Sequence, residues 1–131
     1  MNHKNIFLKS AIITSIFVIF DYLAHYFLTF LNIPVYPYHY FNSATPLINY
    51  SISKILFTFI ALVIFFYLFN YFKTKSKPIQ YIISLVLIVG FLQIRYSTLY
   101  YSPTFQSWNL LNHFIAFSLG FYLSTKVIKN E

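Results

Sequence analysis

Residues 47–77 read LINYSISKILFTFIALVIFFYLFNYFKTKSK, an apolar run that ends in three closely spaced lysines. A helix needs about 20 predominantly apolar residues to cross a bilayer. The run from Leu47 to Phe72 is longer than that and carries a single charge, Lys54. Lysines that directly follow a span usually mark its cytoplasmic end. This stretch therefore predicts a membrane helix followed by a basic cytoplasmic loop.

Three more runs of the same kind flank this one. They extend from Asn5 to Leu31, from Pro78 to Tyr101 and from Gln106 to Val127. The first is too long for the apolar part of a signal peptide and lacks a small-residue cleavage site, so we expect a retained helix. Because the connections are short, neighbouring helices should pack antiparallel. The sequence therefore predicts an all-α fold, a single domain of 131 residues that forms an antiparallel bundle of four transmembrane helices.

The composition excludes several classes of protein. Hydrophobic residues make up 59% of the chain and charged residues 8%, whereas soluble domains average about 25% charged residues. The net charge of +7 is spread over short flanks rather than gathered on one face, so no nucleic-acid partner is expected. The absence of cysteine excludes disulfides, thiolate metal sites and cysteine nucleophiles.

The distribution of lysine and arginine predicts the orientation. The basic residues that flank the runs are Lys4, Lys9, Lys73, Lys75, Lys77, Lys126 and Lys129. The segments Asn32–Pro46 and Ser102–Phe105 contain neither lysine nor arginine. By the positive-inside rule we expect a multi-pass protein of the cell membrane with both termini in the cytoplasm. Its basic flanks should contact anionic membrane lipids.

Four of the predicted helices carry ionisable residues at a similar depth in the outer half of the membrane. They are Asp21, His25, Lys54, Arg95 and His113. At 1.5 Å per residue they lie about 9 to 15 Å from the outer ends of their helices. A charge in the middle of a span costs at least about 2.5–3.5 kcal/mol, so these side chains should point into the bundle and meet. Asn109 lies four residues before His113, which places both on one helix face.

The charges at this depth do not balance. Asp21 is the one carboxylate, and it is opposed by Lys54 and Arg95. If Asp21 pairs with one of these cations, the other needs water, a lipid headgroup or an anionic ligand, because an unpaired buried charge is strongly destabilising. We therefore expect a polar pocket that opens outward and binds an anionic or lipid-like ligand.

Each of these residues also has a purely structural interpretation. Asp21 could bridge the two cations only to fix helix register. Lys54 and Arg95 could extend to the headgroups, since their long stems tolerate apolar surroundings. His113 could do no more than hydrogen-bond across helices. His39, a further candidate for ligand binding in the outer segment, could be an ordinary surface residue.

The first functional hypothesis is an enzyme that modifies a lipid or isoprenoid. Arg95 and Lys54 would bind the anionic group, with Asn109 and His39 as further ligand contacts. Asp21 would orient His25, and His25 or His113 would act as general acid–base. No serine elbow, metalloprotease signature or P-loop specifies a reaction, so the sequence leaves enzymatic activity open.

Two other hypotheses need no reaction. His25 and His113 could ligate a haem whose propionates contact the two cations, since helical bundles do hold cofactors. No bare metal ion is expected, because the neighbouring cations oppose its charge. Alternatively, the chain could be a non-catalytic assembly subunit of a larger membrane complex, in a homo- or hetero-oligomer, with a purely structural ion network.

Overall fold

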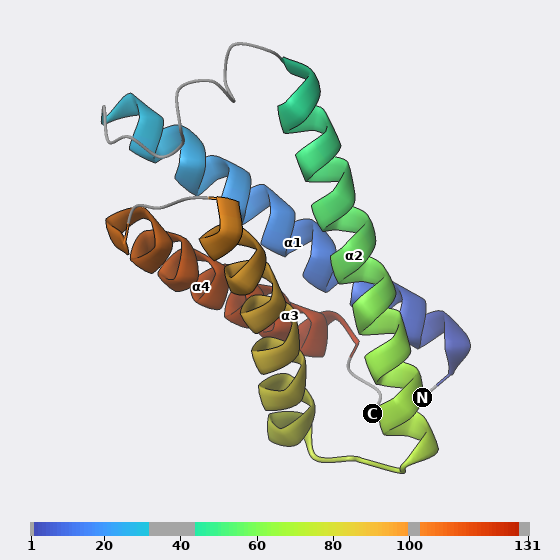
Figure 1. Cartoon of the computed structure of the whole chain (residues 1–131). Coiled ribbons are helices and arrows are strands. Elements are labelled where there is room, and N and C mark those ends of the chain that lie inside the picture. Colours follow the sequence, from blue (N-terminus) through green and yellow to red (C-terminus); the bar gives the residue numbers. More distant parts are fainter. Residues whose placement is uncertain (1, 32–43, 100–102, 129–131) are drawn as a thin grey trace.

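The computed structural model describes residues 2–31, 44–99 and 103–128. Within the helices, the side chains of residues 25, 28–29, 44–51, 95–99 and 103–105 are not described. Four helices, and no strand, form the described part of the chain (Figure 1). They are α1 (His3–Phe30), α2 (Ala44–Tyr71), α3 (Lys77–Leu99) and α4 (Pro103–Val127). The prediction of an all-α fold with four helices is confirmed.

Two helices begin earlier than the sequence analysis placed them. We expected α2 from Leu47 and α4 from Gln106, whereas they begin at Ala44 and Pro103. Both therefore include a proline in the first turn, where the missing N–H removes no helical hydrogen bond. Pro78 occupies the first turn of α3, as predicted.

The C-terminal end of α2 is closed by a Schellman motif. The N–H of Thr74 donates to the carbonyl of Phe69 at 2.8 Å, and the N–H of Lys73 donates to that of Asn70 at 3.1 Å. Lys73 has a positive φ of 54°, a conformation that costs a residue with a side chain roughly 1–2 kcal/mol. Glycine is the usual residue at this position, so a lysine here is unexpected on conformational grounds.

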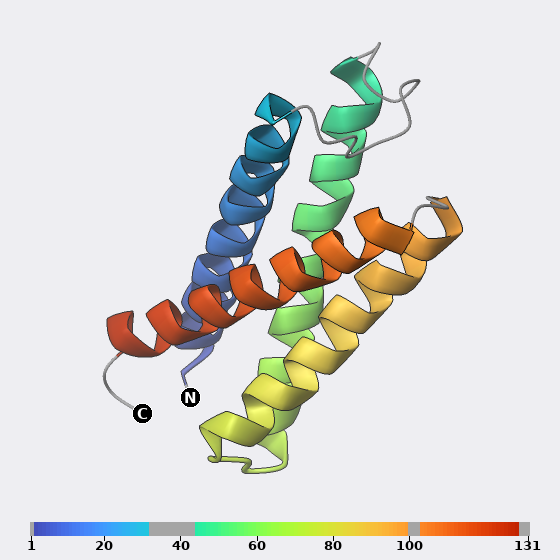
Figure 2. The ribbon, with the colours of Figure 1, turned by 90° about the vertical axis from the view of Figure 1, so that its left-hand side faces the viewer.

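The helices alternate in direction and pack as a bundle. The end of α1, the start of α2, the end of α3 and the start of α4 lie toward one end of the molecule, and the opposite helix ends lie toward the other (Figures 1 and 2). The most extensive interface joins α1 to α4, and the interface between α2 and α3 is much smaller. Figure 2 shows α4 crossing the bundle obliquely, at a large angle to α1.

Buried residues recur every three or four positions on each helix, which is the periodicity of a helix face directed at a core. The core is rich in phenylalanine: Phe17 from α1, Phe66 from α2 and Phe117 from α4 are fully buried. Lys9 also lies in the buried stripe of α1, 3% exposed. The sequence analysis counted Lys9 among the residues that flank the first apolar run, whereas the structure places it within α1, which begins at His3.

The outer surface of the bundle is apolar as well. Side chains that are more than half exposed include Ile19, Leu23, Ile64, Val86 and Ile94. Soluble monomers rarely expose continuous apolar surface of this kind. Three segments are long and apolar enough to cross a membrane: His3–Ala24, Ile52–Tyr71 and Lys77–Ile94. These features are those of a membrane protein.

The fourth predicted span is not among these three segments of the described chain. Helix α4 has 25 residues, so its length is sufficient. Its composition is less apolar because its first half contains Gln106, Asn109, Asn112 and His113. Of these, Asn109 and His113 are buried inside the bundle.

Gly120 permits the close approach of α1 and α4. A Cβ atom at this position would lie 3.0 Å from the backbone oxygen of Ile13 and 3.4 Å from the Cβ of Ile16. Small residues are common where membrane helices cross closely, because they let the backbones touch. The other glycine, Gly90 on α3, would place a Cβ with no heavy atom within 4 Å.

These two glycines provide a matched test of the α1–α4 crossing. We expect Gly120→Ala to be less stable than Gly90→Ala by about 1 kcal/mol or more, because only the first introduces an overpacked contact. Both variants gain about 0.5–1 kcal/mol of helix propensity, so this gain cancels in the comparison. Denaturant unfolding in a mild detergent measures the difference, and equal stabilities would contradict the close crossing.

Candidate functional site

Three helices contribute ionisable side chains to one buried cluster. Asp21 of α1, Lys54 of α2 and His113 of α4 are 5%, 3% and 0% exposed, respectively. The Lys54 ammonium donates a hydrogen bond to Oδ2 of Asp21 and lies 2.8 Å from Nε2 of His113. Nε2 of His113 is 3.3 Å from Oδ1 of Asp21. The structure thus brings together three of the residues that the sequence analysis placed at one depth.

Two further residues complete this cluster, and the sequence analysis missed both. The amide of Asn112 donates to Oδ1 of Asp21 at 2.8 Å. The ring of Phe17 lies 5.0 Å from the Lys54 ammonium and 5.3 Å from the imidazole of His113, tilted by 31°. Asn112 could have been predicted, because it is a polar residue next to His113 within a predicted membrane helix. Phe17 gave no distinguishing signal among 17 phenylalanines.

The contacts constrain the protonation of the cluster. A lysine ammonium has donors only. When Lys54 is charged, its contact with His113 therefore requires Nε2 to accept, which is the neutral imidazole with its proton on Nδ1. The Lys54 ammonium then donates both to the Asp21 carboxylate and to the His113 imidazole.

Asn109 is buried beside this cluster on the same face of α4. It is 3% exposed and lies one helical turn before His113. Neither its amide nitrogen nor its amide oxygen has a hydrogen-bond partner. A buried polar group without a partner costs about 1–3 kcal/mol, and native proteins rarely leave such groups unsatisfied.

A second carboxamide contacts α4 at Gln106, three residues before Asn109. The side-chain nitrogen of Gln93 on α3 donates to the backbone oxygen of Gln106 on α4 at 3.1 Å. The side-chain oxygen of Gln93 is buried and has no partner. Both helices therefore bring buried carboxamide groups with unused hydrogen-bonding capacity to this end of the bundle.

The remaining candidates are placed only in part. His25 lies in α1 and Arg95 in α3, and their side chains are not among those described. His39 lies outside the described residues. The roles in binding and catalysis that the sequence analysis gave to these three residues, and to the cluster, stay predictions.

The described side chains contain no group of three or more histidines or acidic residues that could hold a metal ion. Ligation of a haem iron by Nε2 of His113 would require Lys54 to leave its position 2.8 Å from that nitrogen. The other imidazole of the haem hypothesis, that of His25, is not described. The haem hypothesis therefore stays a prediction.

Comparison with protein-family models, characterised proteins and solved structures finds no match to this chain. What the site can do is therefore inferred from its own side chains. They are a carboxylate, an ammonium, an imidazole and carboxamides, all held between apolar helices.

The cluster makes a definite energetic prediction. We expect Asp21→Asn and Lys54→Met each to destabilise the protein by about 3–5 kcal/mol, because each leaves a buried partner unpaired. The double variant should lose less than the sum of the two, by about 0.5–3 kcal/mol. Unfolding in detergent measures all three.

Lys4→Met is the control for this cycle, because Lys4 is an exposed lysine of the same chain. Its stability should stay within about 0.5 kcal/mol of that of the wild type. Strictly additive losses in the cycle would show that the Asp21–Lys54 contact does not couple α1 to α2.

Proposed function

We propose that all four helices cross the cell membrane, with both termini on the cytoplasmic side. At 1.5 Å per residue α4 is about 37 Å long, which exceeds the hydrocarbon core of about 30 Å. Burial of Asn109 and His113 removes the two most membrane-incompatible side chains of its middle from lipid. The lysines of the α2–α3 loop lie at the same end of the bundle as the start of α1 (Figure 1), in keeping with the positive-inside rule.

The absence of cysteine makes this topology directly testable. A single cysteine at Lys75→Cys, in the α2–α3 loop, should react with a membrane-impermeant maleimide only after the cells are opened. A cysteine at Ser43→Cys, before α2, should react in intact cells. The reverse pattern, or labelling of both on the same side, would contradict the proposed topology.

We further propose that the protein binds a lipid-like ligand with an anionic headgroup in the outer half of the bundle. The carboxamide of Asn109 is the observation that supports this most strongly. It is buried, it has no partner, and it lies one turn from the Asp21–Lys54–His113 cluster. A ligand that offers both a donor and an acceptor would satisfy it and recover the free energy that its burial costs.

The charge count favours an anion. Asp21 is bonded to Lys54, and Arg95 adds a second positive charge at the same predicted depth. An anionic headgroup would balance the set, and such groups suit arginine and lysine. A ligand that reaches this depth between apolar helices enters from the bilayer, so its body should be apolar.

The cluster also suits a reaction class, if the ligand is a substrate. Lys54 can donate a proton and His113 can accept it, while Asp21 holds the lysine in place. A proton donor and a proton acceptor in contact are the groups that general acid–base catalysis requires. Binding is the function that we propose, and proton transfer is the chemistry that this binding site would support.

Native mass spectrometry of the protein in mild detergent tests this proposal. The wild type should carry a bound amphipathic anion, and Arg95→Gln should lose it. Asn109→Leu should lose the ligand as well, while the ligand-free protein gains about 1–3 kcal/mol of stability because an unsatisfied buried amide is removed.

The stability of Asn109→Leu separates binding from a structural role. A variant that binds nothing yet unfolds later than ligand-free wild type indicates that the amide serves a ligand. If the wild type carries no ligand and Asn109→Leu unfolds more easily, the polar residues form a structural network and the binding proposal is wrong.

A further inference from the structure

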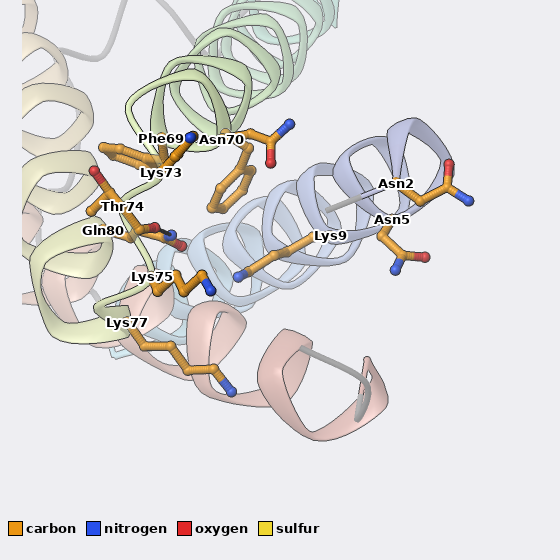
Figure 3. A pocket seen from close by; sticks show the side chains of 11 residues that line it. Asn2, Asn5, Lys9, Phe69, Asn70, Lys73, Thr74, Lys75, Lys77 and Gln80 are labelled. Atoms are coloured by element: carbon orange, nitrogen blue, oxygen red, sulfur yellow. Dashed lines mark hydrogen bonds between the residues drawn. The ribbon is translucent and has the colours of Figure 1, made fainter.

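A second polar site lies at the other end of the bundle. A cavity of about 740 Å³ opens between the start of α1, the end of α2 and the start of α3 (Figure 3). Lys9 at this site is about 18 Å along α1 from Asp21. Nothing in the Asp21–Lys54–His113 cluster contributes to its lining.

The lining is strongly cationic. Lys9, Lys73, Lys75 and Lys77 all line the cavity, and none of the eleven described lining residues is acidic. Asparagine and glutamine side chains supply most of the other polar groups, and Phe66 and Phe69 form an apolar wall. Like charges brought together in this way repel one another, and an anion between them would remove the repulsion.

Lys9 is the buried member of this set. It is 3% exposed, and its ammonium lies 4.7 Å from the ring centroid of Phe66 and 5.3 Å from that of Phe121. The two rings hold the ammonium by cation–π attraction and fix its direction. Figure 3 shows the ammonium groups of Lys9 and Lys75 pointing toward one another across the cavity.

The segment from the end of α2 to the start of α3 carries Lys73, Lys75 and Lys77, and it is fixed by hydrogen bonds. Lys73 occupies the left-handed position of the Schellman motif, where glycine would be favoured by roughly 1–2 kcal/mol. The side chain of Gln80, on α3, donates to the backbone oxygen of Thr74 at 2.6 Å and fastens the loop to that helix. A strained residue that persists in a fixed loop is a frequent mark of a functional position.

We propose that this cavity binds a phosphate-bearing anion. Lysine ammonium groups bind phosphate as point charges, and the first turn of α3, which supplies Lys77, adds the favourable field of a helix N-terminus. The volume lies within the roughly 300–1,000 Å³ typical of small-molecule sites, so it accommodates more than a bare phosphate. The amide side chains of Asn2, Asn5 and Asn70 line the cavity and can bind hydroxyl groups of the same ligand.

A phosphate group at this position has two sources, the headgroup of a membrane lipid and a soluble phosphorylated compound. The chemistry that the lysines recognise is the same in both. In the proposed topology the cavity faces the cytoplasmic side. The binding itself does not depend on that topology or on the ligand proposed for the outer half of the bundle.

Two probes distinguish these sources. Pyrophosphate binding to the protein in neutral detergent is measured by isothermal titration calorimetry. Phosphatidic acid binding is measured by native mass spectrometry after reconstitution in phosphatidylcholine nanodiscs with and without phosphatidic acid. We expect saturable binding of one molecule of at least one probe. Binding of phosphatidic acid alone identifies a lipid headgroup site, and binding of pyrophosphate identifies a site open to soluble phosphates.

Charge-removal variants test whether the cavity is responsible. Lys75→Gln should weaken binding about tenfold or more, the effect of one lost charge-assisted hydrogen bond, and Lys73→Gln combined with it should abolish binding. Both positions are exposed, so the fold should survive. Lys126→Gln is the matched control, an exposed lysine of α4 that is not in the lining, and it should bind as the wild type does.

Two results would overturn the proposal. One is the absence of saturable binding of either probe to the wild type. The other is an equal loss of affinity in Lys75→Gln and Lys126→Gln, which would show general attraction to a basic protein rather than a site. Pyrophosphate lacks the apolar body proposed for the outer ligand, and a loss of phosphatidic acid in Lys75→Gln but not in Lys126→Gln locates that probe in this cavity, so failure of the outer site and failure of this one are separable.

Discussion

The ion pair between Lys54 and Asp21 is the interaction on which the arrangement of the helices depends. A charge inside an apolar bundle is tolerated only with a partner, and each of these residues supplies the other's. The contact of Lys54 with His113 extends the constraint to α4. Since apolar side chains on all faces allow many helix rotations, these directed contacts select one rotation for α1, α2 and α4. Gly120 then sets how closely α1 and α4 approach.

The sequence was sufficient for those features that follow from the cost of burying charge. The length of the apolar runs predicted the four helices. The similar depth of Asp21, Lys54 and His113 along their helices predicted that these three residues would be neighbours. Features that depend on which way a helix faces could not be predicted. Helices that are apolar all round carry little rotational information, so nothing marked Phe17 as a neighbour of the cluster or Lys9 as buried. Helices α2 and α4 begin earlier than predicted because Pro46 and Pro103 lie in their first turns. A proline at such a position is equally compatible with the end of a loop, so the sequence did not decide between the two.

The two polar regions solve the problem of buried charge in different ways. In the Asp21–Lys54–His113 cluster, opposite charges lie in contact, and the unused capacity is that of neutral amides. In the lysine-lined cavity, four lysines and no acidic residue are among the described residues that surround an open volume. A ligand of the kind that we propose would be selected mainly by hydrogen-bond geometry in the first arrangement and mainly by charge in the second. The two regions lie about 18 Å apart along α1, so the two proposals are independent.

A purely structural origin accounts poorly for the polar residues of α4. Buried ion pairs can often be replaced by apolar residues of similar volume with no loss of stability, so stability alone does not explain why α2 carries the buried Lys54. The Asn109 carboxamide is harder still to explain in this way, because its burial without a partner is a net cost. Leucine would fill the same space and make α4 more apolar. An asparagine that weakens the fold in this way is in keeping with the ligand that we propose for it.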